Sequence, residues 1–121
     1  MARMELKVAT DGMREHVVIE LWMDGTPLGH ALLSGAEAES RIQAVGDARS
    51  KLNDAVASTL DPGSRLKPIV NPNWKVEDYR VPEGRIVSLR HPGLGWLTFI
   101  LSEDSASEMV RQLTADLPVR T

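Results

Sequence analysis

The residues of this chain that could do chemistry are its histidines, serines and carboxylates, and the histidines come first. His16, His30 and His91 are not spaced as His-x-His or His-x-x-x-His, the patterns that place two imidazoles on one face of a strand or helix. The chain also has no cysteine, which excludes thiolate catalysis and cysteine-ligated zinc or iron–sulfur centres. The sequence therefore predicts no metal ligands and no cofactor.

The serines and glycines also lack a catalytic setting. The nucleophile elbow G-x-S-x-G is absent, and Ser34 and Ser102 each precede a run with helical spacing, so we interpret both as helix N-caps. Gly93 and Gly95 precede a strand, whereas a phosphate-binding glycine loop opens a helix. No catalytic residue is predicted, and the sequence favours a role other than catalysis.

Aromatic and basic side chains remain as candidates for a protein interface or a ligand site. The six residues that we single out are Trp22, Trp74, Tyr79, Arg90, His91 and Trp96. Such residues could stack on bases and contact phosphates, but a formal net charge of -3 disfavours nucleic acid as a partner. His91 precedes Pro92 in a predicted hairpin, where it could act as an acid or base or cap the turn, and we favour the turn.

The length and composition limit the architecture and the location. A chain of 121 residues supplies one core, so we predict a single domain over residues 1–121. No apolar run approaches the length of a membrane span, and no secretory signal follows the N-terminus. We expect a bacterial cytoplasmic protein with no membrane partner.

The first half of the chain has the pattern of three strands and a helix. The strands are expected at 4–8, 15–23 and 28–33, with Asp24 and Gly25 in the second turn. An even-numbered loop there would place His30 on the core face beside Ile19. A capping box at Ser34 predicts a helix to about residue 58, inside which Gly46 indicates a close backbone approach.

The second half repeats this order with an interruption. A short strand is expected at 66–70, followed by a long irregular loop over 71–84, a hairpin of 85–91 with 96–102, and a helix that opens after Ser102 and runs to about 117. The apolar faces of that hairpin meet only if its loop has an odd number of residues, which places Arg90 opposite Trp96.

These elements predict an α+β fold in two layers. We expect one mostly antiparallel sheet of five to six strands with both helices packed on one face, from β-β-β-α used twice. The other face would carry Trp22 and Trp96, and three covers are open: the 71–84 loop, a second subunit or a small ligand. We expect a homodimeric interaction or accessory module that could also bind another protein. The alternative is a small-molecule-binding protein or minor enzyme with a pocket between the 71–84 loop and the sheet.

Overall fold

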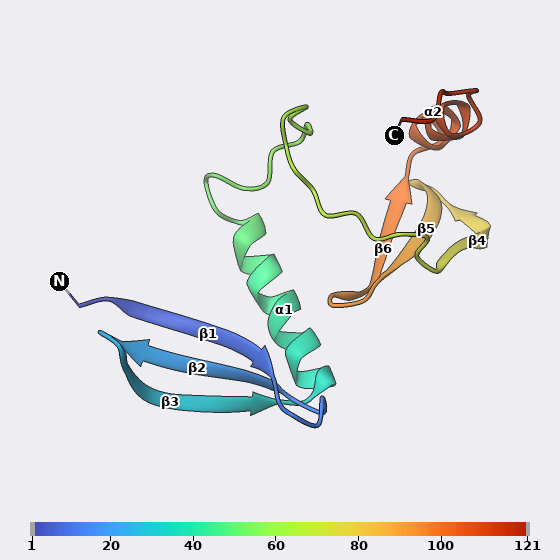
Figure 1. The fold of residues 1–121 in the computed structure, drawn as a ribbon. Coiled ribbons are helices and arrows are strands. Elements are labelled where there is room, and N and C mark those ends of the chain that lie inside the picture. Colours follow the sequence, from blue (N-terminus) through green and yellow to red (C-terminus); the bar gives the residue numbers. More distant parts are fainter. Residues whose placement is uncertain (1, 121) are drawn as a thin grey trace. The chain divides into compact units, whose positions relative to one another are not determined.

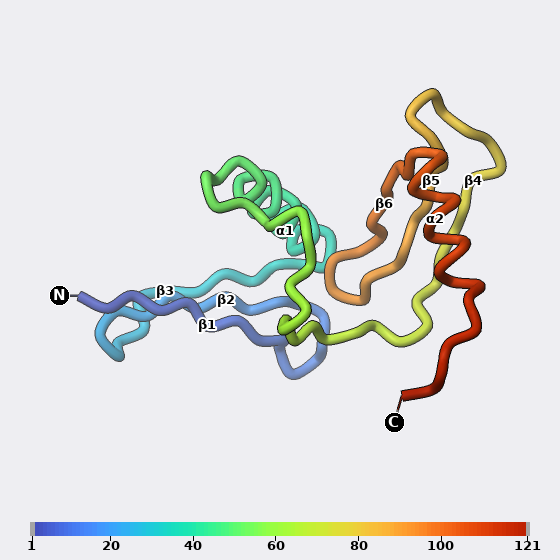
Figure 2. Tube along the Cα trace, turned by 90° about the horizontal axis from the view of Figure 1, so that it is seen from above, coloured from blue at the N-terminus to red at the C-terminus, as the bar shows by residue number. Residues whose placement is uncertain are grey.

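The computed structural model describes residues 2–120 and divides the chain into two compact units, Met1–Ser64 and Arg65–Thr121. Each unit is a three-stranded antiparallel sheet followed by a helix, so the β-β-β-α order predicted for both halves is confirmed (Figures 1 and 2). The single sheet of five to six strands is wrong. Every strand pair joins strands adjacent in the chain, so each sheet is complete within its own unit. The prediction of a single domain stays a prediction.

The first unit contains β1 (Met4–Thr10), β2 (Val17–Met23), β3 (Thr26–Leu33) and α1 (Gly35–Ser50). The loop between β2 and β3 has two residues, an even number. Asp24 and Gly25 have φ angles of 49° and 82°, and such positive values at both positions are typical of a type I′ turn.

A β-bulge changes the faces of this hairpin. Trp22 lies opposite Pro27, but Leu21 lies opposite Gly29, so one additional residue of β3 is accommodated between these pairs. The shift places His30 opposite Glu20, on the face that also carries Lys7. The predicted core position of His30 is therefore wrong, because one inserted residue exchanges the two faces of a strand.

Helix α1 begins as predicted and ends early. The Ser34 hydroxyl accepts a hydrogen bond from the Glu37 N–H at 3.2 Å, and the Glu37 carboxylate accepts one from the Ser34 N–H at 3.1 Å, which is a complete capping box. The last helical residue is Ser50 instead of a residue near 58. Asn53 and Asp54, which follow, have low helix propensity.

The second unit contains β4 (Trp74–Val81), β5 (Gly84–His91), β6 (Gly95–Leu101) and α2 (Glu103–Leu113). The structure has no strand at 66–70, and the predicted 71–84 loop instead contains β4. Trp74 and Val76 alternate with charged residues as a half-buried strand requires. Further on, the three residues between Val76 and Arg80 lie opposite the single Ile86, and this bulge breaks the alternation.

The hairpin of β5 and β6 has the predicted register. His91 lies opposite Gly95, so the connection is the odd-numbered Pro92–Leu94, and Arg90 lies opposite Trp96. The Ser102 hydroxyl then accepts a hydrogen bond from the Ser105 N–H at 3.1 Å and caps α2. This helix ends at Leu113 instead of 117.

Both units leave much apolar surface exposed. Within residues 2–120, Leu33 is the one hydrophobic side chain that is buried, at 9% exposure. No helix in this described part is long and apolar enough to span a bilayer. The apolar side chains of both units are therefore largely accessible to water.

Candidate interaction surface

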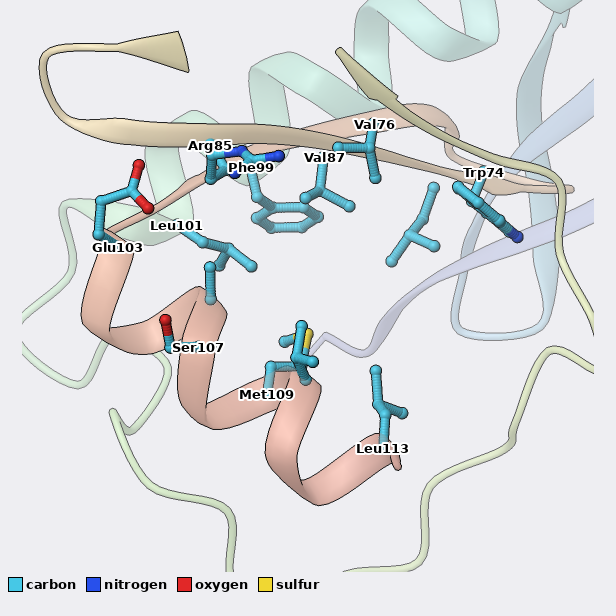
Figure 3. Close-up of a pocket in the computed structure, with 13 residues that line it drawn as sticks. Trp74, Val76, Arg85, Val87, Phe99, Leu101, Glu103, Ser107, Met109 and Leu113 are labelled. Atoms are coloured by element: carbon cyan, nitrogen blue, oxygen red, sulfur yellow. The ribbon is translucent and has the colours of Figure 1, made fainter. Parts of the chain in front are cut away.

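The candidate site is an apolar groove in the second unit, between the sheet and α2 (Figure 3). The strand register arranges the residues of the groove floor in rows across β4, β5 and β6. In the first row, Val76 lies opposite Val87, which lies opposite Phe99. A second row joins Trp74 to Leu89. Neighbouring residues across strands share a face, so these side chains form one continuous apolar floor.

Helix α2 forms the wall of the groove. The lining residues at positions i, i+3, i+4 and i+7 are Ala106, Met109, Val110 and Leu113. This spacing is the apolar stripe that the sequence predicts, and it turns all four side chains toward the sheet. In Figure 3, Met109 and Leu113 lie on the helix side, facing Val87 and Phe99 on the strands.

The groove is open. It encloses about 870 Å³, yet Phe99 remains 49% exposed on its floor and Leu113 77% exposed on its wall. The residues of a filled core would be almost completely excluded from water. The helix and the sheet thus supply two apolar surfaces with space between them.

One end of the groove is charged. Arg85 and Glu103 lie there, at the opposite end from Trp74 (Figure 3). Arg80 forms an exposed ion pair with Glu103, with Nη1 and Oε1 3.3 Å apart. The Nε atom of Arg85 is buried and has no hydrogen-bond partner among residues 2–120. A buried donor without an acceptor is costly, and it lies at the one charged end of an otherwise apolar groove.

The other face of this sheet is more polar. The hydroxyls of Ser88 and Thr98 are 2.9 Å apart in a cross-strand hydrogen bond. Trp96 shares this face with Arg90 and is 51% exposed. Of the six candidate residues, Arg90 and Trp96 thus lie together, on the face away from the groove.

His91 caps the turn after β5, which is the role that its sequence position favours over that of an acid or base. Its Nδ1 atom accepts hydrogen bonds from the N–H groups of Gly93 and Leu94, both at 3.0 Å. These contacts require a ring without a proton on Nδ1. The ring therefore holds the hairpin loop in shape.

The other candidates are dispersed. Trp74 belongs to the groove, whereas Tyr79 lies exposed in the bulged part of β4. Trp22 belongs to the first unit, where Lys7 Nζ stands 3.9 Å from the centre of its ring. The structure therefore groups the six residues in several places and does not gather them on one surface.

Sequence reasoning missed the groove as a site because it assigned the residues to a closed core. The helix stripe and the Val87 and Leu89 face were both identified, but as buried layers. Arg85 on that face was the available signal, since a charged residue in line with Val87 and Leu89 is unusual for a core strand.

The described residues contain no cluster that could hold a metal ion. His16 is engaged locally: its Nδ1 lies 3.0 Å from Asp11 Oδ2. This hydrogen bond, together with one from the Glu15 N–H, lowers the pKa of the Asp11 carboxyl.

No protein-family model, curated protein sequence or solved structure matches this chain. The site is therefore interpreted from its own geometry.

Proposed function

We propose that this chain is a small non-catalytic interaction module of the bacterial cytoplasm that works as a homodimer. The observation that carries the proposal is the open apolar groove between α2 and the sheet of the second unit. A second copy covers this groove in the dimer. The groove supports the proposal because it is a continuous apolar surface, formed by the sheet on one side and by α2 on the other.

The size of the hydrophobic effect favours burial of the groove side chains by a partner. Removing one large apolar side chain from water contributes about 1.5–3 kcal/mol. Association itself costs on the order of 4–15 kcal/mol, so several such side chains must be buried together. The groove offers enough of them: Trp74, Val76, Val87, Leu89, Phe99, Met109, Val110 and Leu113.

Symmetry favours a second copy as the cover. A two-fold dimer lets the same patch serve both subunits, so one apolar surface is hidden twice by one contact. Monomeric proteins rarely leave contiguous apolar patches of this kind open.

Sedimentation velocity with the wild-type chain and two variants tests this. Leu113→Asp places a charge in the groove at an exposed helix position, so the fold should be retained while the dissociation constant of the dimer rises at least about tenfold. Val119→Asp is the control, because Val119 is 90% exposed and does not line the groove.

Circular dichroism confirms that both variants are folded. The proposal fails if the wild-type chain is a strict monomer up to about 0.5 mM. It also fails if folded Leu113→Asp dimerises as tightly as the wild type.

One observation favours a second candidate function, binding of a small amphipathic ligand. The groove volume of about 870 Å³ falls within the ordinary range of ligand sites, and the positive charge of Arg85, which lines one end, suits a carboxylate head group. This groove differs from the pocket predicted between the 71–84 loop and the sheet, because it lies between α2 and the sheet, with Trp74 and Val76 of β4 on its floor.

Decanoate and decanol are suitable probes for this candidate. Decanoate should change the fluorescence of the wild-type protein more strongly than decanol, and Arg85→Met should remove the difference. Equal responses to the acid and the alcohol would reject a carboxylate site.

A further inference from the structure

The edges of the two sheets differ in how they are protected against pairing. The orders β1-β2-β3 and β4-β5-β6 leave β1, β3, β4 and β6 as edge strands. An edge strand exposes unpaired N–H and C=O groups, and proteins protect such edges with charged residues, proline or bulges.

Three of the four edges carry this protection. Strand β1 contains Glu5 and Lys7, and β3 contains Pro27 together with a register shift against its neighbour. Strand β4 is rich in charged residues and contains the bulge before Arg80.

Strand β6 has none of these features. Its sequence Gly-Trp-Leu-Thr-Phe-Ile-Leu contains no charged residue and no proline. Its register with β5 runs from Gly95 to Leu101 without a shift. A regular apolar edge of this kind is a template for strand addition.

We propose that β6 pairs with β6 of a second copy, antiparallel and about a two-fold axis through Thr98. This contact lies at the edge of the sheet and leaves the groove free, so it is an interface in addition to the one in the proposed homodimer. Thr98 is the middle residue of β6, so centring the axis there pairs the whole strand. The contact joins the β4-β5-β6 sheet of one copy to the same sheet of the second copy, which gives one continuous sheet.

This register is self-complementary on both faces. Leu97 lies beside Phe99 of the second copy on the groove face, and Trp96 lies beside Ile100 of the second copy on the other face. Aromatic and aliphatic cross-strand pairs are among the favourable ones. The axis is perpendicular to the sheet, so the grooves of both copies open on the same side.

Charge also favours a second copy of the same strand. Antiparallel self-pairing places each side chain near its equivalents, and in β6 this brings no like charges together. Self-pairing of β4 would instead place its charged side chains beside those of the second copy.

Single-cysteine variants test the pairing, because the natural chain has no cysteine. Two residues at position 98 on the axis would have Cα atoms about 4.5–5.5 Å apart, which suits a disulfide. Thr98→Cys should therefore cross-link almost completely under mild oxidation. Ser88→Cys is the matched control on the same face of β5, where three strand spacings separate the copies by about 14 Å.

Thr98→Lys is the second test. Two lysines would face each other across the axis, so the dissociation constant of the β6 contact should rise about fivefold or more while circular dichroism stays unchanged. If the wild type is a dimer but Thr98→Cys stays reduced, or cross-links no better than Ser88→Cys, the β6 pairing is wrong and the proposed homodimer stands. If the wild type is monomeric, both proposals are wrong.

Discussion

Gly84 at the start of β5 lies directly against the backbone of Leu101 at the end of β6. A Cβ on Gly84 would be 2.7 Å from the carbonyl carbon of Leu101 and 2.9 Å from Cα of Ser102, and it would overlap the Leu101 carbonyl oxygen. Gly84 also has a φ of 141°, a region that side chains other than glycine rarely adopt. Only glycine fits where β5 passes the junction of β6 and α2.

Gly84→Ala should therefore destabilise the second unit by about 3 kcal/mol or more. Urea unfolding combined with amide hydrogen exchange of β5 and β6 measures this. Gly25→Ala is the control, since Gly25 has a φ of 82° but, apart from its chain neighbours, no atom of the described residues lies within 4 Å of its Cβ position. Its cost should be about 1 kcal/mol. Similar losses for both variants would show that the close approach to Leu101 does not matter.

Gly46→Ala should stabilise the first unit. The sequence suggests a close approach at this glycine, but beyond the neighbouring helix backbone no atom of residues 2–120 lies within 4 Å of its Cβ position inside α1. Alanine in a helix interior is favoured over glycine by about 0.5–1 kcal/mol. The free energy of unfolding of the variant measures the gain, and Gly35→Ala, at the first residue of the same helix, should gain less. A loss of stability in Gly46→Ala would instead show that another surface packs closely against α1 at Gly46.

His91→Ala should loosen the second hairpin without affecting dimerisation. The N–H groups of Gly93 and Leu94 would lose their acceptor, at a cost of about 1 kcal/mol. Hydrogen exchange at these two amides should accelerate. His91→Asn should restore part of the protection, because an asparagine side chain can accept from the residue two positions on. A changed dimer dissociation constant in His91→Ala would instead place the ring in the interface.

The Glu108 carboxylate makes the stability of α2 depend on pH. Hydrogen bonds from Arg111 and Gln112 lower the pKa of Glu108 from 4.5 to about 2. The folded state therefore binds this proton less readily than the unfolded state, so the stabilisation is present above pH 4.5 and is lost between pH 4.5 and about 2.

Glu108→Gln should flatten the pH dependence of the free energy of unfolding between pH 4.5 and about 2. Above pH 4.5 the pH dependence should change little. An NMR titration of the Glu108 carboxyl checks the cause directly. A Glu108 carboxyl that titrates near 4.5 would show that the hydrogen bonds from Arg111 and Gln112 do not lower its pKa. Added salt provides a control, since it screens an exposed ion pair with Arg111.

The sequence by itself determined the local features of this protein. The turn at Asp24 and Gly25 and the caps at Ser34 and Ser102 follow from a few neighbouring residues, and the odd-numbered loop after His91 follows from the apolar faces of the two strands that it joins. Turn and cap geometry depends on φ preferences and on hydrogen bonds within one turn of chain, so the residue types suffice. They also fix the order β-β-β-α of the first half, whereas in the second half the sequence placed the first strand at 66–70 instead of Trp74–Val81.

Only the tertiary structure decided which faces and surfaces result. The bulge at Leu21 moved His30 away from the expected core, and the bulge before Arg80 concealed β4 within a predicted loop. Two separate sheets, and an open groove in place of a closed core around Phe99, were likewise not predicted. The physical reason is that pairing is a property of two strands: one inserted residue reverses a face, and its energy depends on partners distant in the chain.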